Sequence, residues 1–193
     1  MSVASQPKRV LKIERSQTEN STVLVYDQFL SHYHVFAIYA FKLYAFDQPF
    51  LQLYHYPIAD NVLVGDAQSF LSTSEIRLTL SGKEYTLTID ADSNSFGLKG
   101  YDEGELRWVK SSHSGNLELE LVDYTGRLLA RLKGCGWPER KKLEVYGECT
   151  ENLLTLMLLS GLVVVDAIFQ RIPLHGKGEP KVHLPHAKKA PRD

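Results

Sequence analysis

Residues 153–169 read LLTLMLLSGLVVVDAIF, and this stretch decides how the rest of the chain must fold. The run follows the helix-capping residue Thr150, carries a single charge at Asp166, and stops before Pro173. Its length of about 17 residues is at the short limit for a membrane-spanning helix, and an aspartate is costly in hydrocarbon. A helix that is apolar on every side must be buried. We therefore predict a core helix over residues 150–171, enclosed by strands.

The sequence before this helix alternates as antiparallel strands do. Residues 76–80 and 85–89 flank the turn Ser81-Gly82 and predict one hairpin with a single inward face. Residues 117–121 and 128–132 flank a turn at 123–126 and predict a second hairpin, with Glu and Arg paired across its outer face. Other strands are expected at 10–13, 21–27, 50–56, 105–110 and 141–146. The aromatic-rich stretch 32–46 favours one long strand or two, with a helix as the alternative. Residues 91–104 indicate a loop around a short extended piece, and residues 57–75 give no clear pattern.

Length and composition bound the class of protein. The chain has 193 residues and a formal net charge of −1, which argues against a nucleic-acid binder with a strong basic excess. Its two cysteines, Cys135 and Cys149, are too few for a disulfide framework and are expected to be reduced thiols in the cytoplasm. We expect a disordered N-terminus over 1–9, one domain over 10–174 and a disordered basic tail over 175–193.

The order of these elements resembles the tubby C-terminal-like superfamily, which includes phospholipid scramblases and LURP-one-related proteins. Residues 106–110 (LRWVK) look like the family's aromatic strand, 120–132 (ELVDYTGRLLARL) like its hairpin, and 153–168 like its core helix with a terminal aspartate. The chain is similar to small, uncharacterised fungal tubby-like domains. The resemblance implies a mainly β (α+β) fold, a closed antiparallel barrel of about twelve strands around the buried helix.

The resemblance is carried by residues 105–171, roughly a third of the chain, and it is more specific for the fold than for a ligand. The sequence has no counterpart of the tubby phosphoinositide-binding cluster of lysine and arginine. It also lacks the Pro-rich and Cys-rich N-terminal parts of scramblases and an acidic calcium loop after the helix. No cofactor or metal is expected.

A basic loop beside an aromatic residue is the strongest local candidate for a binding site. Trp137 lies in the stretch KGCGWPERKK, and basic side chains at an anionic membrane surface contribute about 1 kcal/mol each. The candidate lipid-binding residues are Lys133, Trp137, Arg140, Lys141 and Lys142. The alternative interpretation is an ordinary solvated hairpin loop.

Several other residues could form functional sites, but a structural role explains each of them better. Asp166 is expected to be a hydrogen-bonded carboxylate at the barrel mouth rather than an acid–base catalyst. His32 and His34 share a strand face, but His55 is only a guess as a third metal ligand. Ser160-Gly161 lacks the strand and turn of a nucleophile elbow and fits helix packing better. Cys135 is interpreted as an inert loop thiol.

Three functional hypotheses follow from the sequence. The first is a non-enzymatic, tubby-like binding module in the cytoplasm or at its membrane surfaces, for anionic phospholipid headgroups or a protein partner. The second is a small β-barrel enzyme or carrier with an internal apolar pocket, motivated by the aromatic residues between 32 and 56. The third is a membrane-anchored protein that spans once at 153–169. We adopt the first, and the sequence does not indicate an oligomeric state.

Overall fold

The computed structural model describes residues 6–15, 22–28, 34–40, 50–55, 62–69, 75–90, 95–111, 118–134 and 141–168. Within these residues the chain forms twelve strands followed by one helix. The elements are β1 (Arg9–Arg15), β2 (Thr22–Asp27), β3 (His34–Ala40), β4 (Leu51–His55), β5 (Leu63–Ser69), β6 (Glu75–Leu80), β7 (Lys83–Asp90), β8 (Ser95–Lys99), β9 (Leu106–Lys110), β10 (Leu119–Val122), β11 (Leu128–Lys133), β12 (Lys141–Val145) and α1 (Glu151–Ile168).

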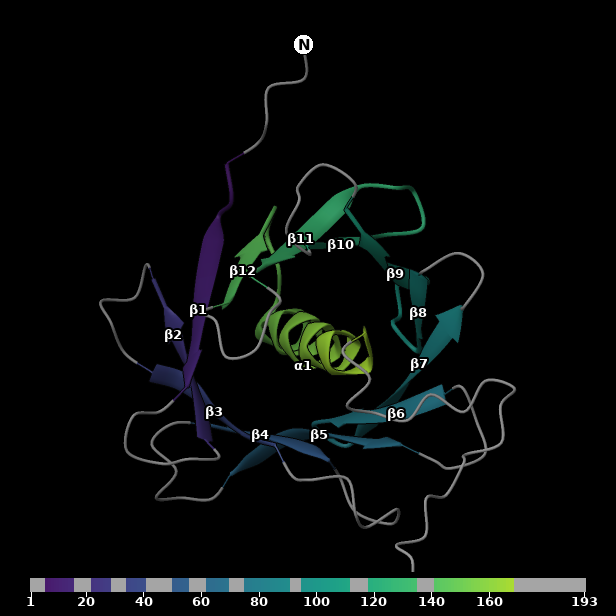
Figure 1. The fold of residues 1–193 in the computed structure, drawn as a ribbon. Helices are drawn as coiled ribbons and strands as arrows, with labels where there is room; N and C mark the ends of the chain where they lie inside the picture. The colour runs from purple at the N-terminus through teal and green to yellow at the C-terminus, as the bar shows by residue number, and fades with distance from the viewer. Residues whose placement is uncertain are drawn as a thin grey trace, which may run out of the picture.

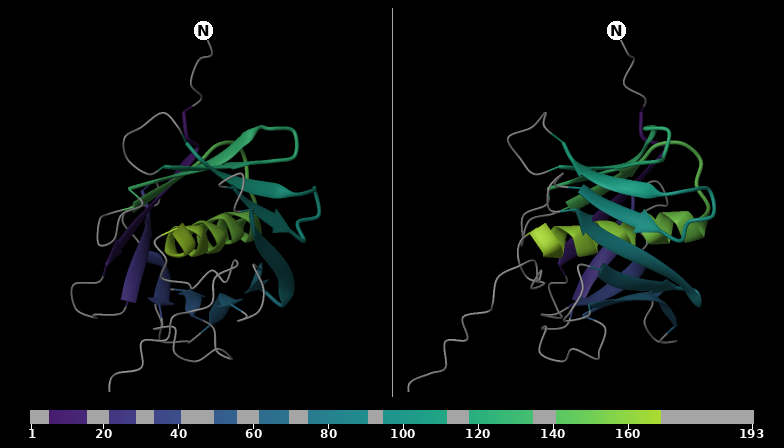
Figure 2. Two further views of the ribbon diagram at one scale, coloured as in Figure 1. Left: turned by 45° about the vertical axis from the view of Figure 1, so that its right-hand side comes forward. Right: turned by 90° about the vertical axis from the view of Figure 1, so that its right-hand side faces the viewer.

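The strands pair antiparallel with their neighbours along the chain, and β1 pairs with β12 as well as with β2. Figure 1 shows the strands arranged around α1, and the turned views in Figure 2 also show the helix inside them. The prediction of a mostly β fold with a C-terminal apolar helix is therefore confirmed. The strand β1 begins at Arg9, one residue before the predicted start of the domain. The predicted tail over 175–193 lies outside the described residues.

The helix α1 is enclosed along most of its length. Every residue from Leu153 to Val165 is buried. By length and composition α1 is apolar enough to cross a membrane, but 78% of that segment is buried inside the fold. Thr150 caps the helix as predicted, because its Oγ1 accepts a hydrogen bond from the Leu153 backbone N–H at 3.2 Å. The helix is described as far as Ile168, so residues 169–171 of the predicted helix are not tested.

One polar contact inside the core joins the sheet to the helix. Trp108 of β9 is fully buried, and its Nε1–H donates a hydrogen bond to Ser160 Oγ at 3.0 Å. The Ser160 hydroxyl donates in turn to the Leu156 carbonyl at 2.6 Å. A Cβ at Gly161 would lie 3.0 Å from the Trp108 ring, so the indole needs a glycine beside it. The Ser160-Gly161 pair is thus explained by packing against Trp108.

Both predicted hairpins are present. β6 and β7 are joined by Ser81 and Gly82, both with positive φ, and β10 and β11 by the turn from Asp123 to Gly126. Across the second hairpin, Arg131 lies 2.7 Å from Glu120, the cross-strand pairing expected from the sequence.

The structure also contains elements that the sequence did not show clearly. β5 lies in the stretch without a readable pattern, and β8 is a full strand where only a short extended piece was expected. The inward positions of β5 include Gly65 and Ala67, and a Cβ at Gly65 would lie 2.7 Å from the Thr79 carbonyl of β6 and 3.3 Å from Leu159 of α1. A small residue is needed where β6 and the helix come close to this strand, so the usual strand signal of large apolar residues is missing.

The Trp108–Ser160 contact predicts the effect of one substitution. Ser160→Ala leaves a buried indole N–H without its acceptor, so we expect the free energy of unfolding to fall by about 1–3 kcal/mol. Equilibrium urea unfolding of the full chain measures the change.

Thr155→Val is the matched control on the same helix. Thr155 is also buried, but its hydroxyl donates to the Glu151 carbonyl, which a helix N–H can still satisfy after the change. We expect a clearly smaller loss of stability for this variant. Equal losses for the two variants would contradict a special role for the indole contact.

Candidate functional site

The predicted lipid-binding residues do not all reach the surface. Lys142 is exposed and Lys133 is partly exposed, both on the outer face of the sheet. Lys141 is only 2% exposed and shares the inner face with Leu143 and Val145. The prediction of Lys141 as a surface residue is wrong, because side chains alternate along β12 and the apolar positions set which face is inside. Trp137 and Arg140 lie outside the described residues.

Three lysines lie next to one another across the outer face of β1, β12 and β11. Lys142 is directly opposite Lys12 on one side and directly opposite Lys133 on the other. We call these three residues the lysine row. Residues opposite each other in a sheet have Cβ atoms about 4.5–5.5 Å apart, a spacing at which like charges destabilise the pairing. Within the described residues, no carboxylate forms an ion pair with Lys12 or Lys142.

The neighbouring charges on these strands are arranged differently. Arg131 pairs with Glu120, and Glu144, which is opposite Arg131, lies 2.9 Å from Lys133 Nζ. Glu120, Arg131 and Glu144 therefore form a row in which the charges alternate in sign and cancel, whereas the three side chains of the lysine row are all positive. The part of the lysine row formed by Lys12 and Lys142 is therefore a local positive surface, although the formal net charge of the chain is −1.

Sequence reasoning did not find Lys12. Its place in the site depends on the pairing of β1 with β12, strands that are far apart in the chain, and no local pattern reveals that register. The inward placement of Lys141, by contrast, follows from the spacing of Leu143 and Val145, so that signal was present in the sequence.

The remaining predicted residues are dispersed. Asp166 lies in the last turn of α1 and is partly exposed. His55 is exposed in β4, whereas the side chains of His32 and His34 lie outside the described set, as does Cys135. The described residues contain no group of three or more His, Cys, Asp or Glu side chains that could hold a metal ion.

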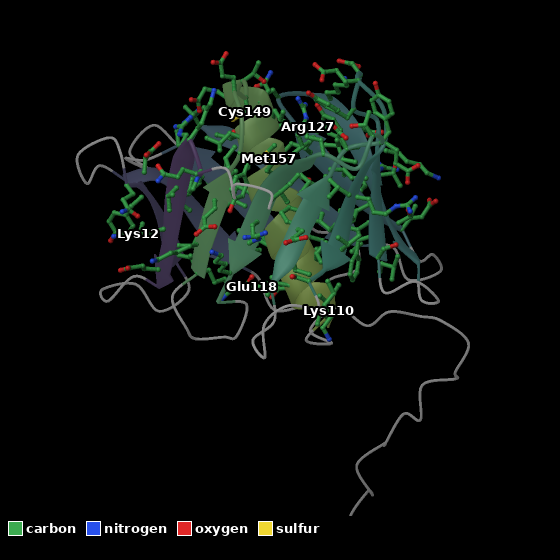
Figure 3. The ribbon with its side chains drawn as sticks, turned by 90° about the horizontal axis from the view of Figure 1, so that it is seen from above. Lys12, Lys110, Glu118, Arg127, Cys149 and Met157 are labelled. Atoms are coloured by element: carbon green, nitrogen blue, oxygen red, sulfur yellow. The ribbon has the colours of Figure 1, made fainter. Side chains whose placement is uncertain are left out.

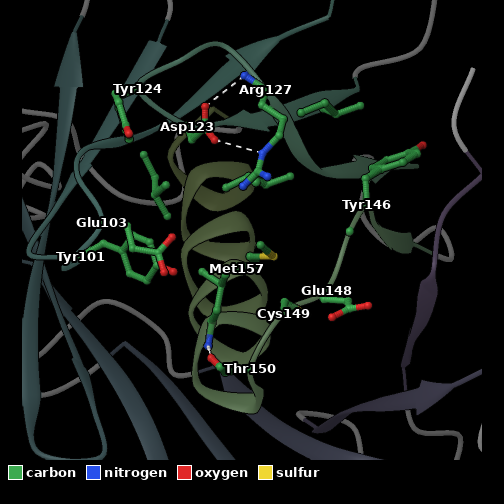
Figure 4. A pocket seen from close by; sticks show the side chains of 15 residues that line it. Tyr101, Glu103, Asp123, Tyr124, Arg127, Tyr146, Glu148, Cys149, Thr150 and Met157 are labelled. Atoms are coloured by element: carbon green, nitrogen blue, oxygen red, sulfur yellow. Dashed lines mark hydrogen bonds and ion pairs between the residues drawn. The ribbon is translucent and has the colours of Figure 1, made fainter.

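A second feature, a cleft of about 320 Å³, opens where α1 begins. Figure 3 shows Cys149 at this end of the molecule and Glu118 with Lys110 at the other. We call this cleft the helix-start cleft. Figure 4 shows its walls, which come from Tyr101–Glu103, from the turn at Asp123–Arg127 and from the connection 146–150. Its presence was not predicted from the sequence.

The ionisable groups of the helix-start cleft are perturbed by burial and by their neighbours. Burial, with a hydrogen bond from its hydroxyl to Glu144, raises the pKa of Tyr146 to about 12. Burial also raises the pKa of the Cys149 thiol, which makes it a weak nucleophile at neutral pH. The pKa of Asp123 is lowered by hydrogen bonds from Thr125 and from Arg127.

Comparisons with known proteins give no relative from which a function can be transferred: no family model, no curated protein and no solved structure matches the chain. The functional conclusions therefore depend on the residues themselves.

The lysine row predicts an unusual gain of stability on charge reversal. Lys142→Glu replaces the repulsion from Lys12 by an attraction, whereas Lys133 is already paired with Glu144, so we expect the free energy of unfolding to rise by up to about 1 kcal/mol at low salt. Urea unfolding measures the change, and added salt should reduce it.

Lys99→Glu is the control for this prediction. Lys99 is exposed on β8 and lies opposite Thr86, so its reversal has no opposing charge to relieve. A change within about 0.5 kcal/mol is expected, as for ordinary surface substitutions. A Lys142→Glu variant no more stable than Lys99→Glu would show that the lysines do not repel one another.

Proposed function

We propose that the protein is a tubby-like closed barrel that acts as a non-enzymatic binding module for anionic phospholipid headgroups, through the lysine row. The single observation that supports this most directly is the direct opposition of Lys12 and Lys142 without a carboxylate partner in the described residues. Like-charge pairs of this kind cost stability. A site that binds phosphate explains why they are placed together.

The architecture supports the same proposal. The pairing of β1 with both β2 and β12, around a helix that is apolar on every side, is the arrangement that the tubby-like resemblance implies. An enclosed helix has no free apolar face for lipid, which disfavours the single-span hypothesis. The same helix fills the space that an internal carrier pocket would need, which disfavours the second hypothesis.

The sequence between β11 and β12 contains residues suited to a membrane contact. The segment 135–140 joins β11 to β12, so it connects the strands that carry Lys133 and Lys142. Its sequence CGWPER contributes Trp137, an aromatic residue suited to the headgroup level, and Arg140. On β2, Tyr26 is directly opposite Lys12, so an aromatic side chain with a polar hydroxyl lies next to the lysine row.

Vesicle flotation tests the proposal with the full chain. We expect binding to vesicles of phosphatidylcholine with phosphatidylserine at low salt, no binding to phosphatidylcholine alone, and loss of binding as salt rises. Lys12→Gln combined with Lys142→Gln should weaken binding by roughly fivefold per lysine, since each contributes about 1 kcal/mol near an anionic surface.

The matched control removes the same charge elsewhere. Lys83→Gln combined with Lys99→Gln removes a partly exposed lysine of β7, which pairs with Asp102, and an exposed lysine of β8. This variant should leave flotation within about twofold of the parent, because surface charge acts within a Debye length of about 10 Å. Equal losses of vesicle binding in the two double variants would show that binding depends on net charge and not on the lysine row. Absence of flotation of the parent chain at low salt would reject the proposal.

A further inference from the structure

The helix-start cleft has an apolar floor. Its deepest residues come from β9, β11 and the first turns of α1, and each is at most 9% exposed. They are Leu106, Leu129, Leu153 and Met157. Because such side chains offer no hydrogen-bonding atoms, the inner part of the cleft suits an aliphatic group.

The charged groups at the rim are already paired, with one exception. Asp123 binds Arg127, Glu148 lies 3.3 Å from Lys8, and Glu103 accepts a hydrogen bond from the Tyr101 hydroxyl. The rim carboxylates therefore each have a partner, and a cationic ligand would have to compete for them.

The exception is the far end of the Arg127 guanidinium. Asp123 holds this residue at two points, with Oδ2 3.2 Å from Nε and Oδ1 3.0 Å from the backbone nitrogen. The two terminal nitrogens make no hydrogen bond to any described residue. In Figure 4 the side chain points into the cleft, over the part of α1 that carries Met157. An oriented guanidinium with two free nitrogens is a fork that matches a carboxylate or phosphate.

The start of α1 favours the same sign of ligand. Thr150 and Leu153 line the cleft, so the positive end of the helix dipole lies at its wall. The side chain of Arg127 is 71% exposed, which places the anion at the surface and the apolar part of the ligand inside.

We propose that the helix-start cleft binds a small anionic amphiphile, with its carboxylate or phosphate on Arg127 and its alkyl chain on the floor formed with Met157. The volume of about 320 Å³ equals that of about ten water molecules at ~30 Å³ each, and a methylene group is of similar size. A chain of about ten carbons therefore fills it. This site is independent of the lysine row and of the proposed vesicle binding.

Cys149 provides a direct measure of occupancy, because its thiol lines the cleft. The experiment uses the full chain with Cys135→Ser, so that Cys149 is the remaining cysteine, and follows its alkylation by iodoacetamide at mildly alkaline pH. Decanoate below its micellar concentration should slow alkylation at least fivefold, with saturable binding by titration calorimetry. Decyltrimethylammonium at the same concentration should leave the rate unchanged.

Arg127→Gln tests whether this arginine binds the anionic head group of the ligand, and Arg77→Gln is the control variant. We expect decanoate affinity to fall at least tenfold in Arg127→Gln and to stay within twofold in Arg77→Gln, where the arginine is on β6 and pairs with Glu84. Decyl phosphate serves as a second probe. Tighter binding than decanoate would assign the natural head as phosphate, and weaker binding would assign it as carboxylate.

Three results would overturn the proposal: failure of both anionic probes to protect Cys149, equal protection by decyltrimethylammonium, or unchanged affinity in Arg127→Gln. Near-ultraviolet circular dichroism of each variant, with and without probe, separates loss of binding from loss of fold. None of these outcomes bears on flotation with anionic vesicles, so the two proposals fail separately.

Discussion

Burial of a helix that has no polar face is the constraint on which the rest of the structure depends. α1 has to be surrounded, and the strands supply an apolar inner face along the helix from Leu153 to Val165. The fit is specific where the sheet and helix come closest: Gly65 leaves room for Leu159, and Gly161 leaves room for Trp108. The Trp108–Ser160 hydrogen bond satisfies the one polar group of that indole and joins β9 to α1 inside the apolar core.

Among the described residues, polar chemistry is concentrated at the helix ends and on the outer face of the sheet, with the buried Lys141 on the inner face as an exception. At the start of α1, Arg9 of β1 pairs with the buried Asp27 of β2 and with Glu151, which ties the first turn of the helix to two strands. Thr150 caps the same turn, and the helix-start cleft opens beside it. A rigid helix terminus next to a small cleft is suited to bind a ligand, because little ordering is required when the ligand arrives.

The sequence predicted those parts of the fold that local patterns determine. The apolar run of 153–169, the Thr150 cap and the two hairpins were each recognisable from periodicity and turn residues. β5 was missed because its inward positions are small where β6 and the helix come close, a tertiary requirement that no local pattern carries. The same holds for the candidate site. Lys142 and Lys133 were predicted from the local sequence, whereas Lys12 lies beside Lys142 only because of the register of β1 with β12.

That register also explains how a nearly neutral chain acquires a basic surface. Over the whole chain, 22 lysines and arginines are balanced by 23 aspartates and glutamates, and the formal net charge is −1. Once the strands are paired, the alternation of side chains brings Glu144 beside Arg131 and Lys133 while it lines up Lys12 with Lys142. A shift of β1 by one residue would turn Lys12 inward and bring Leu11 and Ile13 to the surface. The apolar packing around α1 therefore fixes the position of the charges, so the core that encloses the helix also determines the surface proposed to bind phosphate.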